Sequence, residues 1–146
     1  MKVGIANDHA ATDMKKAVMK HLQDEGYEVV DYGTDGYESV DYPDYAEKVC
    51  HGVLSHEVDL GIAICGTGVG ISIACNKIKG IRCAHCSETY SAEFSRRHND
   101  ANVVAFGARV VGEEIAFQIA DTFLKTPFEG GRHQRRVDKS NKLDER

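Results

Sequence analysis

Residues 60–76 read LGIAICGTGVGISIACN, and this stretch decides how the rest of the chain is interpreted. Its first six residues form a continuous apolar run, which is typical of a β-strand covered on both faces of a sheet. Glycines follow at positions 66, 68 and 70, and a helical pattern begins near residue 70. A buried strand that passes through a glycine-rich turn into a helix indicates one unit of a parallel sheet.

The same alternation of strand and helix occurs five times. Apolar runs predict strands over residues 2–7, 27–33, 60–65, 81–86 and 103–107. Helical spacing of apolar residues predicts helices over 14–22, 43–54, 70–78, 88–99 and 112–126,. We therefore expect an α/β fold in which a five-stranded parallel sheet carries helices on both faces.

The composition is that of one globular domain with an uneven charge. The chain has 146 residues, of which 42% are hydrophobic and 28% charged, and its net charge is −5,. Residues 127–146 hold six Lys/Arg and four Asp/Glu, so this tail carries +2 and residues 1–126 carry −7. We expect an α/β domain over 1–126 with the basic tail as part of it. A small anionic ligand fits this charge, whereas nucleic-acid and membrane-surface binding do not.

The five cysteines and the first residues bear on the compartment. MKVGIANDHA lacks the pattern of a signal peptide, and no apolar run is long enough to span a bilayer,. Cysteines without an export signal are expected to be reduced, which predicts a cytoplasmic protein. Cys83 and Cys86 form a C-x-x-C pattern, but residues three apart in a strand point to opposite faces, so we expect no metal site.

The segments that follow the predicted strands form the candidate site. Ligands of open parallel sheets bind at the carboxyl ends of the strands. This rule selects residues 7–9, 65–70 and 107–109 together with Ser87.

The glycines of residues 66–70 have three interpretations. Successive N–H groups without Cβ atoms at a helix start can approach an oxyanion closely. A tight turn needed only for packing is the simpler alternative. A dinucleotide fingerprint fits poorly, because the spacing is G-x-G-x-G after the third strand, although Glu88 lies at a suitable distance,.

Cys65 also has two interpretations. A thiol just before a helix N-terminus is expected to have a lowered pKa, which would make it a usable base or nucleophile. A small buried hydrophobic residue that ends a strand is the alternative. The hydroxyl of Thr67 in the same loop favours chemistry.

Further polar residues are ambiguous in the same way. Asp8 could bind a ligand or cap the next helix, and His98 could act in chemistry or complement a helix dipole. Arg132 and Arg136 share a face if the tail is helical, and guanidinium groups suit phosphate, whereas a solvated basic helix is the alternative. His21 has no acidic neighbour on its helix pattern and is interpreted as a surface or filler residue.

Together, five stretches resemble the sugar-phosphate isomerase family that contains type B ribose-5-phosphate, galactose-6-phosphate and allose-6-phosphate isomerases. They are NDHA, DYPDYA, CGTGVGISIACNK, GIRCAHCSETYSAEFSRRHNDANVVAFGARVVG and EGGRHQRRV, and they cover nearly the whole chain in order. The resemblance implies a Rossmann-like three-layer α/β/α sandwich with a C-terminal helical tail. It also implies an aldose–ketose isomerase that works through an enediolate without a metal or an organic cofactor.

The resemblance implies a role for each candidate residue. Cys65 would move the proton between C1 and C2, and His98 would assist opening of the sugar ring. The other residues would bind the sugar phosphate: Gly66, Thr67, Gly68, Val69 and Gly70 at the oxyanion, Asp8, His9, Asn99 and Arg109 at the sugar, and Arg132 and Arg136 at the phosphate, with His133 nearby.

Function and assembly follow from the same resemblance. We expect interconversion of ribose 5-phosphate and ribulose 5-phosphate in the pentose phosphate pathway. The alternatives are an isomerase of allose 6-phosphate or galactose 6-phosphate and a non-catalytic phosphosugar- or nucleotide-binding module, and segment 34–40 leaves the sugar preference open. A homodimer is expected, with a homotetramer left open. The break at Gly130 and Gly131 is expected to leave the tail free to depart from its own subunit and reach a neighbour's pocket.

Overall fold

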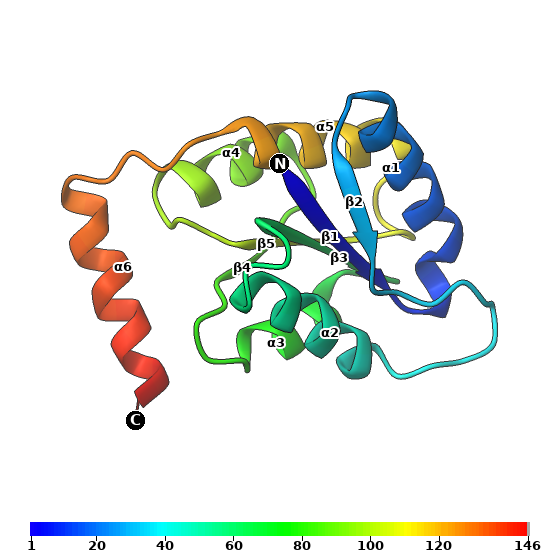
Figure 1. The fold of residues 1–146 in the computed structure, drawn as a ribbon, viewed down its shortest axis with the longest axis horizontal. Helices are drawn as coiled ribbons and strands as arrows, with labels where there is room; N and C mark the ends of the chain where they lie inside the picture. The colour runs from blue at the N-terminus through cyan, green and yellow to red at the C-terminus, as the bar shows by residue number, and fades with distance from the viewer. Residues whose placement is uncertain (146) are drawn as a thin grey trace.

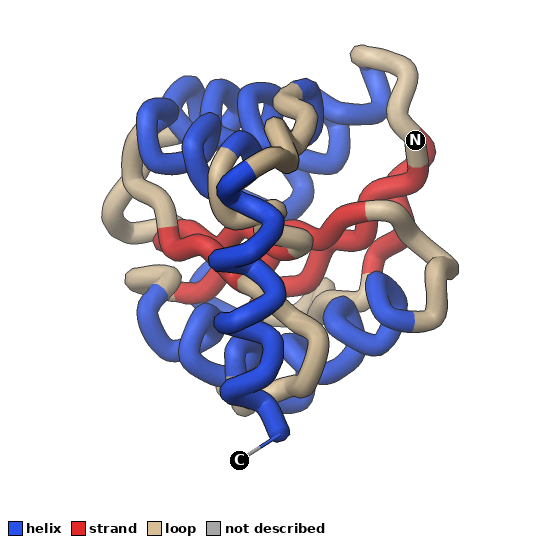
Figure 2. The backbone as a smooth tube through the Cα atoms, turned by 90° about the vertical axis from the view of Figure 1, so that its left-hand side faces the viewer, coloured by secondary structure: helices blue, strands red, loops and turns tan. Residues whose placement is uncertain are grey.

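The computed structural model describes residues 1–145 and shows a five-stranded parallel sheet between two layers of helices (Figures 1 and 2). All neighbouring strands are parallel, and the order across the sheet is β2-β1-β3-β5-β4. The strands are β1 Lys2–Asn7, β2 Glu28–Asp31, β3 Leu60–Cys65, β4 Cys83–His85 and β5 Val103–Gly107. The predicted α/β sandwich is therefore confirmed. The two edge strands, β2 and β4, are shorter than the predicted ranges 27–33 and 81–86.

The helices divide between the two faces of the sheet. One face is covered by α1 (Thr12–Asp24), α4 (Thr89–Arg97) and α5 (Glu113–Lys125), the upper layer in Figure 1. The other face is covered by α2 (Tyr42–Leu54) and α3 (Val69–Asn76). The 3₁₀ turns η1 (His9–Ala11) and η2 (Leu143–Glu145) and the tail helix α6 (Arg132–Lys142) complete the chain. Within residues 1–145, no helix combines the length and the apolarity needed to cross a membrane.

Strand β3 lies at the centre of the sheet and is buried along its whole length. Ile62 and Ile64 pack under α1 and α5, while Ala63 and Cys65 face α2 and α3. Small residues allow α2 to approach closely: a Cβ at Gly61 would lie 3.2 Å from side-chain atoms of Val49 and Val53. The apolar run that indicated a strand covered on both faces is thus explained by its central position.

The order of the strands creates one switch point. β1 pairs with β2 on one side and with β3 on the other, so the chain leaves the carboxyl ends of β1 and β3 in opposite directions. A crevice between the two departing segments is the usual ligand site of an open α/β sheet.

The tail helix packs on its own subunit. Figure 2 shows α6 crossing one end of the sheet, outside both helical layers. The Arg82 guanidinium donates a hydrogen bond to Asn141 at 3.1 Å, the Gly80 amide donates to Asp144 at 3.1 Å, and Val137 is buried. The expectation of a tail free to leave its own subunit is therefore wrong, because these contacts hold it at the amino ends of β4 and β5.

A second correction concerns His21. Its Nε2 lies 3.0 Å from Asp121 of α5 and 3.3 Å from Glu25, and its ring stacks on Phe117. His21 was expected to lack acidic neighbours, and this is wrong, because Asp121 is brought to it by the packing of α1 against α5.

Ionisation of the Tyr32 hydroxyl is expected to make the stability of the fold depend on pH in the alkaline range. Burial, followed by its hydrogen bond to Glu57 at 2.8 Å, raises the pKa of Tyr32 from 10.0 to about 12. A group with a raised pKa stabilises the fold while it stays protonated, so stability falls as pH rises between these values. We expect Tyr32→Phe to make the free energy of unfolding depend less steeply on pH over that interval. Urea unfolding would measure it, with Tyr90→Phe, an exposed tyrosine, as the control. Equal slopes in wild type and Tyr32→Phe would contradict the prediction.

Candidate active site

The site residues predicted from the sequence lie in two groups at opposite ends of the sheet. The first group follows the carboxyl ends of β1, β3 and β5, whereas the second lies where the chain enters β5 and on α6. The Gly61 amide donates to the Asn102 carbonyl at 3.0 Å, which places the segment after His98 beside the start of β3. Leu60 and Cys65 are five residues apart in β3, so at about 3.3 Å per residue its ends are separated by roughly 16 Å,. We define the first group as Asp8, His9, Cys65, Gly66, Thr67, Gly68, Val69, Gly70 and Arg109, and the second as His98, Asn99, Arg132 and Arg136.

Cys65 is the centre of the first group. Its side chain is buried, with the residue 5% exposed, and the Gly68 N–H donates a hydrogen bond to its Sγ at 3.2 Å. The Thr67 hydroxyl oxygen accepts a hydrogen bond from the Val69 N–H at 3.1 Å. The glycine loop thus turns over the sulfur, with a backbone donor placed to stabilise negative charge on it.

The loop after β5 fixes the glycine loop. The Ala108 and Arg109 amides donate to the Cys65 and Gly66 carbonyls at 2.9 and 3.0 Å. A Cβ at Gly107 would lie 2.5 Å from the Thr67 backbone, so the two loops touch main chain to main chain. This contact brings the Arg109 side chain over Gly66, where an added Cβ would lie 3.4 Å from the guanidinium. The structure thus brings Cys65 and Arg109 close together, and their shared role in one site stays a prediction.

Two further residues border this loop and were not predicted. The His85 Nε2–H donates to the Thr67 carbonyl at 3.0 Å, and the ring of Tyr42 covers Gly70, where an added Cβ would lie 2.8 Å from it. His85 ends β4, so the rule of strand carboxyl ends could have selected it. Tyr42 precedes Pro43 at the start of α2 and carries no such signal.

Asp8 and His9 are held by local hydrogen bonds. The Asp8 carboxylate accepts from the Ala10 amide at 3.0 Å and caps η1, so its capping interpretation is confirmed while its binding role stays a prediction. The His9 Nδ1 accepts a hydrogen bond from the Val40 amide at 3.1 Å. Glu88 is engaged as well, since it caps α4 through the Ser91 amide at 2.8 Å. The carboxylate that a dinucleotide site would need is therefore used in a helix cap.

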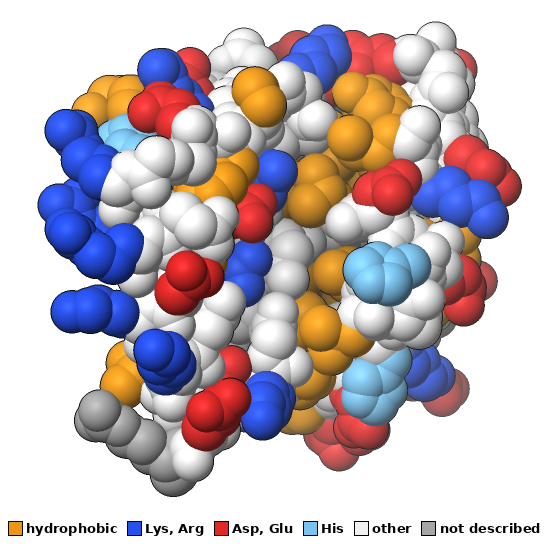
Figure 3. Space-filling model, turned by 60° about the vertical axis from the view of Figure 1, so that its left-hand side comes forward, with side chains coloured by type: hydrophobic (Ala, Val, Ile, Leu, Met, Phe, Trp, Pro, Cys, Tyr) orange, Lys and Arg blue, Asp and Glu red, His pale blue; other side chains and the backbone are white. Residues whose placement is uncertain are grey.

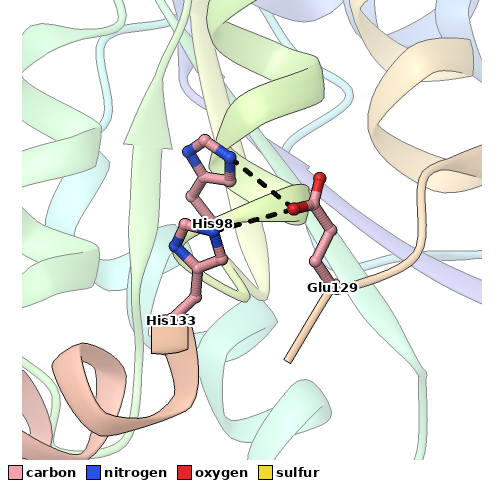
Figure 4. A group of neighbouring side chains, drawn as sticks. All are labelled: His98, Glu129 and His133. Carbon is pink, nitrogen blue, oxygen red and sulfur yellow. Dashed lines mark ion pairs between the residues drawn. The ribbon is translucent and has the colours of Figure 1, made fainter. Parts of the chain in front are cut away.

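His98 of the second group stacks on His133, next to Glu129 (Figure 4). The rings of His98 and His133 have centroids 4.0 Å apart and are 12° from parallel. The Glu129 carboxylate lies 3.9 Å from the Nε2 of His98 and 3.6 Å from that of His133. Arg97 also donates to this carboxylate and, as the largest influence, lowers its pKa.

The charges around these histidines suit an anion. The ligand atoms of His98, Glu129 and His133 all lie within 4.8 Å of one another, and such a group can in general bind a metal ion. Here, however, burial and then the charges of His98, Arg132 and Arg136 lower the pKa of His133, with Glu129 opposing them. Such positive surroundings disfavour a cation and favour a phosphate group.

A cleft opens next to the second group, between α6 and the body of the subunit. Figure 3 shows this side, with basic side chains along the tail and hydrophobic side chains in the hollow beside it. The cleft has a volume of about 220 Å³ and is lined by Asn76, Arg82, Cys83, Asn99, Arg136, Val137 and Ser140. Asn99 and Arg136 therefore share one surface, which does not contain Cys65.

Known proteins share this arrangement of the whole chain. The sequence pattern of the family described as "Ribose/Galactose Isomerase" matches residues 3–140. The chain belongs to this family. Ribose-5-phosphate isomerase B of Escherichia coli strain K12 is 52% identical over 99% of this chain and 97% of that protein. The D-erythrulose-4-phosphate isomerase of Pectobacterium atrosepticum is 41% identical over 95% of this chain and 92% of that protein.

A solved structure agrees with the fold of this Ribose/Galactose Isomerase family member. The ribose-5-phosphate isomerase B of Clostridium thermocellum superposes with a TM-score of 0.97 at 53% identity, covering 99% of this chain and 98% of that chain. The five-stranded sheet and its helices are therefore the architecture of the family.

Substitution of Gly68 tests whether the stability of the fold depends on the left-handed backbone conformation at this position. Its φ is +83°, and an added Cβ would lie 2.7 Å from the Phe106 backbone. We expect Gly68→Ala to lower the free energy of unfolding by at least about 1–2 kcal/mol, the cost of a left-handed conformation for a residue with a side chain. Gly112→Ala is the control, because a Cβ there meets nothing within 4 Å. Denaturant unfolding measures both, and a Gly68→Ala protein as stable as Gly112→Ala would contradict the prediction.

Proposed function

We propose that this protein interconverts ribose 5-phosphate and ribulose 5-phosphate. The observation that carries the proposal is the Cys65 thiol at the end of β3, hydrogen bonded by the Gly68 amide at the switch point of the sheet. The substrate follows from the similarity to ribose-5-phosphate isomerases B, at 52% and 53% identity over nearly the whole chain. An aldose–ketose isomerase needs a base beside a site that stabilises an oxyanion.

The first group supplies the proton-transfer chemistry. The Cys65 thiolate takes the proton from C2 of the open-chain aldose, and the electron pair moves to the carbonyl oxygen to give an enediolate. Backbone amides of the glycine loop and the Thr67 hydroxyl stabilise the negative oxygen. A proton moves from the C2 hydroxyl to the oxygen on C1, and the thiol returns its own proton to C1 as the carbonyl forms at C2, which completes the ketose. These steps involve proton transfer only, so the mechanism requires neither metal nor organic cofactor.

The second group holds the other end of the substrate. Arg132 and Arg136 bind the phosphate, and His98 acts as acid and base when the furanose ring opens, beside Asn99. About 16 Å of β3 separates these residues from Cys65 of the same chain, which is more than a pentose phosphate spans,. The site is therefore completed by a second copy of the chain, which places the tail arginines, His98 and Asn99 of one subunit against Cys65 of the other.

An exposed apolar surface next to Cys65 supports this assembly. Val69 and Ile73 lie one turn apart on α3 and are 46% and 55% exposed, and the ring of Tyr42 adjoins them over Gly70. Exposed apolar patches of this kind mark protein–protein contacts. A homodimer joined over α3 buries this surface next to the glycine loop.

All five cysteines are free thiols, which agrees with a cytoplasmic location.

The substrate and the base are tested together. Purified protein, offered ribose 5-phosphate, allose 6-phosphate and galactose 6-phosphate separately in a coupled assay, is expected to turn over ribose 5-phosphate with the highest kcat/KM. Cys65→Ala is expected to bind the substrate but to lose at least about 10²-fold in kcat, because proton abstraction becomes unassisted. Cys86→Ala, a buried thiol on the opposite face of the sheet, is the control. Near-normal turnover by Cys65→Ala would remove this thiol from the mechanism.

Subunit mixing tests the composite site. Cys65→Ala and His98→Asn subunits are each expected to be inactive alone. If sites are shared between subunits, a mixed dimer contains one site with neither defect, so activity returns on mixing. Cys65→Ala mixed with Arg132→Ala/Arg136→Ala subunits should behave in the same way.

The control is to demonstrate that the subunits exchange, for example by native mass spectrometry of tagged chains. A mixture that remains inactive although exchange is shown would place Cys65 and His98 of one chain in the same site.

A further inference from the structure

Lys15 is a fully buried charge outside the two groups of site residues. Its side chain is 0% exposed, and its Nζ donates to Asp31 at 2.7 Å, to Asp35 at 2.6 Å and to the Thr34 carbonyl at 3.1 Å. All three N–H donors of the ammonium are therefore used. A buried charge is stable only when it is paired and hydrogen bonded in this way.

Two of the Lys15 partners, Thr34 and Asp35, belong to one irregular segment, and the third, Asp31, is the last residue of β2 before it. Residues 32–41 run from the end of β2 to the start of α2 without regular secondary structure. Burial alone would lower the pKa of Lys15, but the hydrogen bonds and charges of Asp31 and Asp35 together raise it. Through these three hydrogen bonds, the ammonium attaches the end of β2 and this segment to α1.

Further hydrogen bonds join segment 32–41 to the chain after β1. The Asn7 side-chain amide donates to the Thr34 carbonyl at 3.1 Å, and the Thr12 hydroxyl donates to the Gly36 carbonyl at 2.7 Å. Gly33 lies so close to Asn7 that a Cβ would overlap its side-chain oxygen. These hydrogen bonds thus hold the segment beside the residues that lead from β1 into η1.

The position of segment 32–41 determines which nitrogen of the His9 ring carries a proton. The Val40 N–H donates to the His9 Nδ1 at 3.1 Å. Because Nδ1 is an acceptor here, the neutral imidazole has its proton on Nε2. Nε2–H is then a hydrogen-bond donor for a sugar or phosphate oxygen.

We propose that Lys15 is a positioning residue for this site: it fixes segment 32–41, and the segment holds His9 as the tautomer protonated on Nε2. The inference rests on the proposed function in one respect, since it assigns His9 to the same substrate site. Lys15 itself does not touch the substrate. It acts through Val40 on a donor that must be aligned before the sugar binds.

Lys15→Met removes the charge and the donors while keeping a long side chain. The imidazole ¹⁵N resonances of His9, assigned with His9→Gln, are recorded without substrate at a pH where histidines are neutral. Wild type is expected to show an unprotonated Nδ1 and a protonated Nε2, and Lys15→Met a mixture of tautomers. Because misplaced groups cost up to about 10²-fold in rate, kcat/KM is expected to fall by that order.

Two further variants separate positioning from general destabilisation. Lys20→Met removes an exposed lysine from the same helix and is expected to change neither readout. Lys15→Met/Asp31→Asn/Asp35→Asn leaves no unpaired carboxylate from the cluster, so it is expected to fold even if Lys15→Met does not, and to retain the tautomer mixture and the low kcat/KM.

The inference is overturned if folded Lys15→Met or the triple variant keeps the wild-type His9 resonances. It is equally overturned if the tautomer changes while kcat/KM stays at the wild-type value. The resonances are read without substrate, so failure of the proposed function would appear separately, as wild-type protein without isomerase activity but with a single His9 tautomer.

Discussion

Strand β3 carries the central constraint of this molecule, since it is buried on both faces and pairs with β1 and β5. A strand in that position cannot bend or shift without exposing apolar surface, so it holds its two ends at a fixed separation. One end presents Cys65 and the glycine loop. The other adjoins the chain that carries His98 and receives the tail. The residues predicted to form the site therefore lie in two groups at opposite ends of the subunit.

The charged and polar surroundings differ between the two groups of predicted site residues. Around Cys65, the Gly68 amide donates to the sulfur, and the Arg109 guanidinium lies over the neighbouring Gly66. In the second group, burial and then the charges of His98, Arg132 and Arg136 lower the pKa of His133, which Glu129 opposes. A phosphate binds best at the second kind of surface and an enediolate oxygen at the first. The same separation explains why the group in Figure 4 is better suited to an anion than to a metal ion.

Much of the fold and part of the site could be predicted from the sequence. The hydrophobic pattern and the positions of the glycines predicted all five strands. The rule that ligands bind at strand carboxyl ends selected both Cys65 and Arg109, which lie close together in the structure. The errors concern contacts between distant segments. Asp121 pairs with His21 across 100 residues, and Val137 packs the tail onto its own subunit. Neither contact leaves a periodic signal, because it depends on which helices become neighbours.

The sequence by itself determined the α/β class, the thiol that ends a buried strand, the glycine loop and the family, because hydrophobic periodicity and local motifs are properties of consecutive residues. Only the tertiary structure decided the strand order β2-β1-β3-β5-β4, the position of α6, and the placement of His98 at the opposite end of the sheet from Cys65. It also decided that Lys15 pairs with Asp31 at the end of β2 and with Asp35 in the irregular segment that follows. These features depend on how separate elements pack, and packing is governed by shape and burial over the whole chain.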